Sequence, residues 1–313
     1  MSIGHRPRPP ARRRARTTVA GVRGGRPPTD RDERVVTGSQ PRIADRRSAA
    51  GDDSRRPDAD ILSLIADPFT SVADAHERLT TLEATFRERG DRRGAFLCVY
   101  ARVTEAVGSA IDDGEFADPK WVTDYLVTFA DLYREALLAY ETGDLVALPD
   151  PWQVAFETAA RGDALVVQDV VLGINAHVNY DLALALHRVG VGPDRRARYA
   201  DHCAVNAVLR SLVDEVQDRI AEYYAPGVAA LDESLGRFDE GVSMFSLAEG
   251  RDSAWRSAVA LSSRFRLRRR VARWVLRTSS TGTAYLLLAP TVSRSVADAL
   301  AGVERGEGHV AEE

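Results

Sequence analysis

The residues best suited to chemistry lie in one short apolar stretch, where a histidine and an aspartate stand four residues apart. His177 and Asp181 belong to the run G-I-N-A-H-V-N-Y-D-L. On a helix this spacing places both side chains on the same face, one turn apart. Gly173, one turn before His177, is expected to leave open space beside the imidazole. Burying a carboxylate is costly unless it is paired or bound to a cation, so Asp181 must have a partner.

The sequence is compatible with two kinds of partner for His177 and Asp181. One is a divalent transition metal such as zinc, iron or manganese, held by His177, Asp181 and Asp201. The other is a buried network without a metal, in which Arg251 clamps Asp181 or Asp201. An isolated H-x-x-x-D pair is a weak metal signal, and a nearby arginine favours the network. The predicted polar centre comprises His177, Asn179, Asp181, Asp201, Asn206 and Arg251.

The helix that must position this pair, residues 163–189, is apolar on nearly every face. Such a pattern is typical of a helix at the centre of a bundle. The valine-rich run 165–172 is also compatible with a buried strand, but the length of the apolar segment and the absence of turn signals favour a helix.

Other segments show apolar residues at spacings of three and four, with capping signals at their ends. Ser71 with Asp74, Ser246 with Glu249, and Asp118 before Pro119 each indicate a helix start. The remaining predicted helices cover residues 71–90, 91–114, those from 118 and from 150, 194–224, 228–237, those from 246, and 285–303. We therefore predict an all-α, single-domain bundle of about eight helices over residues 60–305, around the central apolar helix.

The two ends of the chain differ from this domain. The first 50 residues hold 13 arginines and four acidic residues, a net charge of +9, so the remaining 263 residues carry −13. Residues 1–59 contain almost no large apolar side chains and are predicted to be a disordered arm, as is a tail over 306–313. The arm either contacts a polyanion or is a solvated tail, and it could also be sequence upstream of the true start.

A second basic segment runs from Arg264 to Arg277, with seven arginines in fourteen residues and Trp274 among them. It could contact an anionic membrane or a nucleic acid. Alternatively, the arginine stems cover apolar surface while their head groups pair with the acidic body. The charge of the body favours this second interpretation.

The composition indicates a cytoplasmic protein without a transmembrane segment. No run of 18 apolar residues occurs, and no apolar stretch follows Arg12-Arg13-Arg14 as an export signal would require. Cys98 and Cys203 are too few and too far apart for a disulfide framework, so we expect free thiols. Phosphate-binding glycine motifs and the nucleophile elbow of hydrolases do not occur in the sequence.

Several of these residues, taken together, resemble the sequence pattern of a known protein family. They are Phe129-Ala130 with Tyr133, Trp152 and Phe156, the run 173–182, Asp201 with Asn206, and Arg251-Asp252 before Ala254-Trp255. Over roughly residues 60–275 the chain resembles an uncharacterised prokaryotic family, the domain-of-unknown-function family 5995. The resemblance implies that this region is a domain, and it implies no activity. It also implies that the six polar residues named above form the polar centre of the family. A narrower similarity, limited to His177 and Asp181, is to helical zinc-dependent phospholipases C and single-strand nucleases.

Two functional hypotheses follow. In the first, the chain is not an enzyme, and its polar centre is a structural or small-ligand-binding network. In the second, it is a metal-dependent hydrolase in which His177, Asp181 and a carboxylate such as Asp201 hold a metal that activates water. Whether the His–Asp face opens into a cleft or is sealed by Arg251 distinguishes the two hypotheses.

Overall fold

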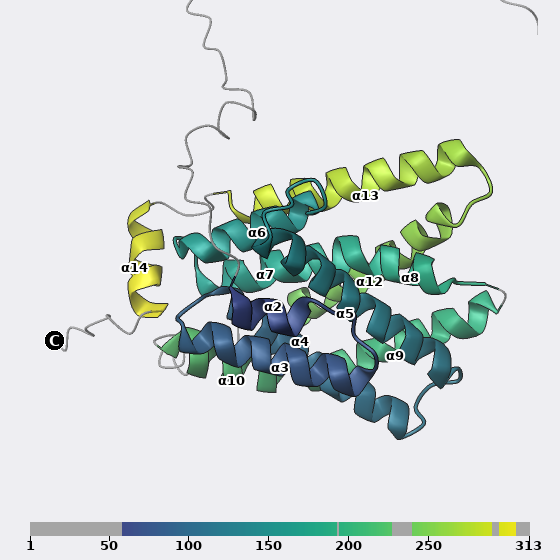
Figure 1. The fold of residues 1–313 in the computed structure, drawn as a ribbon, viewed down its shortest axis with the longest axis horizontal. Coiled ribbons are helices and arrows are strands. Elements are labelled where there is room, and N and C mark those ends of the chain that lie inside the picture. Colours follow the sequence, from purple (N-terminus) through teal and green to yellow (C-terminus); the bar gives the residue numbers. More distant parts are fainter. Residues whose placement is uncertain (1–57, 193, 227–239, 290–293, 305–313) are drawn as a thin grey trace, which may run out of the picture. The chain divides into compact units, whose positions relative to one another are not determined.

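The computed structural model describes residues 58–192, 194–226, 240–289 and 294–304, and throughout these ranges every regular element is a helix (Figure 1). The all-α prediction is therefore confirmed. The elements are α2 (Ala59–Ile65), α3 (Val72–Glu88), α4 (Arg93–Asp112), α5 (Pro119–Glu141), α6 (Asp150–Arg161), α7 (Val166–Ala176), the π-helical η1 (His177–Asp181), α8 (Leu182–Val189), α9 (Arg195–Ser211), α10 (Val213–Tyr224), α12 (Glu240–Leu261), α13 (Arg266–Leu287) and α14 (Arg294–Glu304).

The segment α7–η1–α8 is one continuous helix, and with it the described residues form eleven helices, where the periodicity predicts about eight. This helix packs against α4, α5, α6, α12 and α13, so it has neighbours on several sides, as its apolar composition predicts. The alternative strand over 165–172 does not form, because α7 begins at Val166.

Several helix boundaries differ from those that the pattern predicts, and a short helix, α2, is additional. The predicted helix over 285–303 does not form as one helix, because residues 285–287 end α13 and α14 begins at Arg294. The segment 194–224 is divided at Leu212, a buried residue between α9 and α10. Helix α12 begins at Glu240, so Ser246 lies inside it rather than at its start. It also ends before the arginine-rich segment, where the Phe265 N–H donates to the Ser263 hydroxyl in a local turn that competes with the helix.

Other local predictions agree with the structure. The Ser71 hydroxyl accepts from the Asp74 N–H at 3.0 Å, and the Asp118 carboxylate accepts from the Trp121 N–H at 3.0 Å. Cys98 and Cys203 are free thiols. Of the predicted arm over 1–59, only residues 58 and 59 are described, and Ala59 begins α2. The predicted helix over 228–237 and the tail over 306–313 lie outside the described residues.

One described helix, α4, is long and apolar enough to cross a membrane by length and composition alone. Its buried residues, among them Phe96, Leu97 and Tyr100, pack into the core of the bundle. The described residues therefore give no clear transmembrane segment.

The first turn of α7 carries a buried carboxyl group, Asp169. Burial and a nearby arginine change its pKa in opposite directions. Burial raises the pKa of Asp169 to about 6, against the effect of the Arg92 guanidinium, whose Nε lies 2.7 Å from Asp169 Oδ2. This ion pair does not have the geometry of a hydrogen bond. The neighbouring Glu304 carboxylate, from α14, accepts from the Val166 N–H and also raises the pKa of Asp169.

We expect the Asp169→Asn substitution to change the pH dependence of stability. Between about pH 4 and 6 the folded protein keeps a proton on Asp169 that the unfolded chain has lost, so the free energy of unfolding falls as the pH rises. A shift of about two pKa units corresponds to about 3 kcal/mol. Urea denaturation at pH 4.5, 5.5 and 7 should show that the variant gains about 2 kcal/mol of stability relative to the parent between the lowest and the highest of these pH values. A difference that does not change with pH would contradict this assignment.

Candidate functional site

A buried hydrogen-bonded chain joins Trp152, Asp181 and His177. Trp152 Nε1–H, from α6, donates to Asp181 Oδ2 at 2.7 Å, and the same oxygen lies 3.1 Å from His177 Nδ1. His177 and Asp181 are 2% and 1% exposed. They are the first and last residues of η1, where the Leu182 N–H donates to His177 O, five residues back. A π-helical turn of this kind is rare in proteins and is often found at functional sites.

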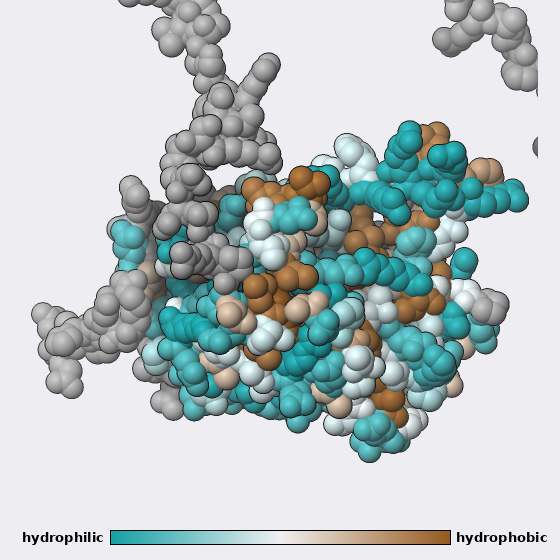
Figure 2. Space-filling view, viewed as in Figure 1, coloured by the Kyte–Doolittle hydropathy of each residue, from teal (hydrophilic) through white to brown (hydrophobic). Residues whose placement is uncertain are grey.

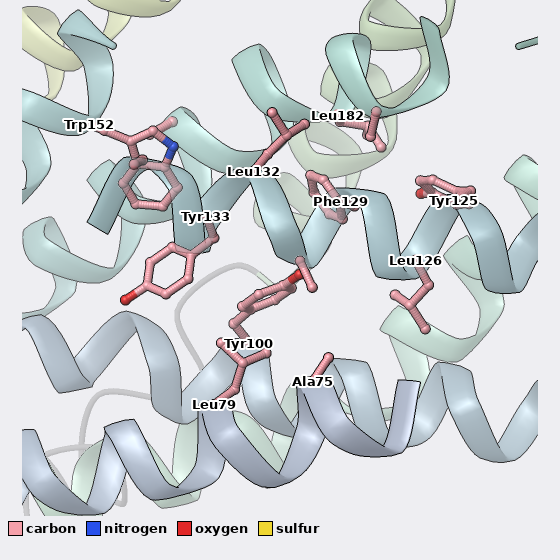
Figure 3. Close-up of a cluster of buried hydrophobic side chains, with 14 of the residues drawn as sticks. Ala75, Leu79, Tyr100, Tyr125, Leu126, Phe129, Leu132, Tyr133, Trp152 and Leu182 are labelled. Atoms are coloured by element: carbon pink, nitrogen blue, oxygen red, sulfur yellow. The ribbon is translucent and has the colours of Figure 1, made fainter. Parts of the chain in front are cut away.

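Aromatic rings from three other helices enclose the His177 imidazole. Phe129 stacks on it with the ring centroids 3.5 Å apart and an interplanar angle of 10°, and Tyr100 meets it edge-on at 4.3 Å. Figure 3 shows Tyr100 from α4, Phe129 and Tyr133 from α5, and Trp152 from α6 gathered in one buried cluster. We call the rings around His177 the aromatic cage; its members are Phe96, Tyr100, Phe129, Tyr133 and Trp152.

Burial within the aromatic cage shifts the pKa values of His177 and Asp181. Burial lowers the pKa of His177 well below its usual value and raises the pKa of Asp181 well above its usual value, although the hydrogen bond from Trp152 opposes the second shift. Both shifts favour the uncharged form of the group, and one hydrogen bond between Asp181 Oδ2 and His177 Nδ1 joins the two side chains. The other ring nitrogen of His177, Nε2, is buried within the aromatic cage and has no hydrogen-bond partner in the described structure.

Asp181, although 1% exposed, is also among the residues that line a groove of about 580 Å³ beside α5 and α8. Apolar side chains form much of its wall, and they include Leu132, Ala136, Leu138, Ala139, Ala147, Pro149 and Leu184. Glu135 and Arg188, which also line the groove, form a two-pronged ion pair at 3.0 and 3.1 Å. Asp181 therefore belongs both to the hydrogen-bonded chain beside the aromatic cage and to the wall of this groove.

The expectation of open space beside His177 is wrong. A Cβ on Gly173 would lie 2.5 Å from two ring atoms of Phe96 and 2.8 Å from its Cβ. The glycine is needed because the Phe96 ring occupies that position, and the same ring contacts His177 with centroids 5.7 Å apart. The space that glycine leaves is filled by the cage.

Arg251 belongs to a second buried network and clamps neither Asp181 nor Asp201. Its guanidinium donates to Asn206 Oδ1 at 2.7 Å, to His202 O at 2.7 Å and to the Tyr125 hydroxyl at 3.3 Å. In return, His202 Nε2–H donates to Arg251 O at 3.1 Å. Burial, together with the charge of Arg251, lowers the pKa of His202 well below its usual value.

Asp201 and Asn179 each form hydrogen bonds outside these two networks. The Asp201 carboxylate accepts from the backbone N–H groups of Ala117 and Asp118 at 2.8 and 2.9 Å, and so holds the turn before α5. Asn179 donates to Asn175 Oδ1 at 2.9 Å, and Asn175 in turn donates to Ser280 O, which ties η1 and α7 to α13. The six residues predicted as one polar centre are thus distributed over separate networks.

These placements bear on the metal-ligand set predicted from the sequence. His177 and Asp181 are adjacent, but Asp201 makes its contacts at the start of α5. Within the described residues, no group of three or more His, Cys, Asp or Glu side chains could hold a metal ion. The structure therefore does not assemble His177, Asp181 and Asp201 as one ligand set.

The main functional residue that the sequence pattern does not reveal is Trp152. Its spacing marks it as an apolar helix residue, and it is buried as that pattern predicts. A buried indole N–H needs an acceptor, and a buried carboxylate needs a donor. These two requirements were the only signal in the sequence that could have paired Trp152 with Asp181.

Comparison with known proteins gives one match. The family model described as "Family of unknown function (DUF5995)" matches residues 72–290, a range that includes the aromatic cage, both networks and the groove. Neither a curated protein nor a solved structure matches the chain.

Proposed function

Because the chain belongs to the family of unknown function DUF5995, whose description names no activity, we propose a function from the site itself: the protein binds a small molecule in the groove beside α5 and α8, with Asp181 as its polar anchor. The observation that carries this proposal is that Asp181, although 1% exposed, lines the groove while Trp152 and His177 hold its other side.

The groove has the properties of a ligand site. Its volume of about 580 Å³ suits a small organic molecule, and its walls are largely apolar with a few polar groups. Asp181 is pre-positioned, because Oδ2 is fixed by Trp152 and His177. No group within the described part of the chain donates to Oδ1, so this atom can accept a hydrogen bond from a ligand.

The chemistry of the walls indicates the class of ligand. Burial raises the pKa of Asp181 and so favours its uncharged form, to which a neutral hydroxyl or amine group can bind without leaving a buried charge unpaired. Leu132, Ala136 and Leu184 would contact the hydrocarbon part of the molecule. We therefore propose a small, largely apolar ligand that carries one hydrogen-bond donor.

Binding fits this geometry better than hydrolysis. A histidine that acts as a base needs one ring nitrogen within reach of the substrate. His177 Nδ1 faces Asp181, and Nε2 lies inside the aromatic cage, while His177 is not among the residues that line the groove. The histidine therefore supports Asp181 instead of facing the bound molecule.

The test uses aromatic and alkyl alcohols and amines as probes, with binding detected by saturation-transfer NMR. Ala147 is exposed and lines the groove, so Ala147→Trp should block it. Val146 is 99% exposed and does not line the groove, which makes Val146→Trp a matched control. We expect probes that bind the parent and Val146→Trp but not Ala147→Trp. They should also shift the indole N–H resonance of Trp152, which is bonded to Asp181.

Probe binding that persists in Ala147→Trp would refute the groove as the binding site. Binding that is lost in Ala147→Trp without a shift of the Trp152 resonance would retain the groove but reject Asp181 as the anchor. The Trp152→Phe variant assigns that resonance among the four tryptophans of the chain.

A further inference from the structure

Helix α13 carries an apolar stripe that points away from the rest of the bundle. Its buried residues Leu276, Ser280 and Ala284 are four apart and so define the side that faces the bundle. The opposite side carries Leu267, Val271, Trp274 and Tyr285, which are 74, 50, 66 and 59% exposed. We call these four residues the outer stripe. In Figure 1, α13 lies at the edge of the bundle.

Arginines flank the outer stripe along the helix. At 3.6 residues per turn, Arg266, Arg270 and Arg277 follow one edge of the stripe, and Arg268 lies on the other. Figure 2 shows hydrophilic and hydrophobic residues side by side at the exposed end of this helix. The surface is therefore both apolar and positively charged.

Most of these arginines are not neutralised by the acidic body. Arg277 pairs with Asp150 at 2.6 and 2.8 Å. Across the described ranges, no carboxylate forms an ion pair with Arg266, Arg268, Arg270 or Arg273. The interpretation in which the head groups pair with the body thus holds for Arg277, while Arg266, Arg268, Arg270 and Arg273 are available for a partner.

We propose that α13 docks on the surface of an anionic lipid membrane, with the outer stripe in the interface and the arginines against the lipid phosphates. A helix with tryptophan and leucine on one side and arginine beside them has the composition of an interfacial membrane helix. Arginine stems extend along apolar surface while their head groups reach polar lipid, which suits the positions of Arg266 and Arg270.

Two other occupants fit this surface less well. A nucleic acid would pair with the arginines but would leave Leu267 and Val271 in contact with phosphates or water. A second copy bound through the same face would cover the stripe but would place the unpaired arginines of two helices beside each other. A bilayer of acidic lipids provides both the apolar layer and the negative charge.

The experiment measures binding of the full chain to vesicles of phosphatidylglycerol and phosphatidylcholine, with pure phosphatidylcholine vesicles for comparison. Since residues 1–50 are also strongly basic, binding at α13 is read from the fluorescence of Trp274, not from sedimentation alone. We expect a blue shift with the anionic vesicles that disappears in Trp274→Phe. The shift should weaken as the salt concentration rises.

Two further double variants separate the apolar contribution to membrane binding from the electrostatic contribution. Leu267→Ser with Val271→Ser should weaken binding to anionic vesicles at least tenfold, whereas Val146→Ser, at an equally apolar and fully exposed loop position, should not. Arg266→Gln with Arg270→Gln should remove the preference for anionic lipid. The altered side chains are exposed, so an unchanged melting temperature serves as the folding control.

Equal binding to both vesicle types would overturn the proposal, as would the absence of a Trp274 shift. Stripe-dependent dimerisation without vesicle binding would identify a second copy as the occupant. A Trp274 response to single- or double-stranded DNA but not to vesicles would identify a nucleic acid. The groove variant Ala147→Trp should bind vesicles normally, because this inference does not depend on the proposed ligand site.

Discussion

Gly173→Ala is expected to destabilise the protein by about 3 kcal/mol, the upper part of the range for overpacked cores. The added Cβ would lie 2.5 Å from the ring of Phe96 and 2.8 Å from its Cβ. Because the contact reaches the Cβ of Phe96, a rotation of the ring cannot relieve it, and α4 and α7 would have to move apart. The same movement would disturb the aromatic cage around His177.

Gly282→Ala is the matched control for this substitution. Gly282 also lies in a helix, but a Cβ there meets nothing within 4 Å. Alanine at such a position should stabilise the protein by about 0.5–1 kcal/mol, since glycine costs that much inside a helix. Both variants can be compared by urea denaturation. The double variant Gly173→Ala with Phe96→Ala should show strong coupling between the two sites, and additive effects would count against the contact.

The second large effect is expected at Asp181, where leucine and asparagine should behave very differently. Leucine has a similar size but leaves Trp152 Nε1–H and His177 Nδ1 unpaired in a buried site. Each lost partner costs about 1–3 kcal/mol, so we expect Asp181→Leu to lose about 3–5 kcal/mol of stability. Asparagine should lose less than about 1 kcal/mol, because a carbonyl oxygen in the position of Oδ2 can accept from Trp152 Nε1–H and also from His177, once the neutral imidazole carries its proton on Nδ1.

This comparison also tests the protonation state. An asparagine side chain is uncharged, so it can replace a protonated aspartic acid beside a neutral imidazole but not a carboxylate paired with an imidazolium. A loss in Asp181→Asn as large as that in Asp181→Leu would show that the pair is charged. Denaturation of both variants at pH 7, with far-ultraviolet circular dichroism to confirm the helical fold, gives the answer.

Features that depend on residues close together along the chain can be predicted from the amino-acid sequence alone. Helices follow from apolar spacing and from caps such as Ser71 and Asp118, which act within one turn. The adjacency of His177 and Asp181 also follows from one helical turn, and the need of Asp181 for a partner follows from the cost of burying it. The family membership rests on the same linear information.

Which distant residue contacts each of these groups depends instead on how the helices pack in three dimensions. The partner of Asp181 is Trp152, 29 residues away, and the space beside Gly173 belongs to Phe96 on another helix. Arg251, expected beside Asp181 or Asp201, instead binds Asn206, His202 and Tyr125. The physical reason is that periodicity defines which face of a helix is buried, while the packing of whole helices defines what that face contacts. Hydrogen-bonding needs can be read from a sequence, but the groups that satisfy them depend on how the helices pack.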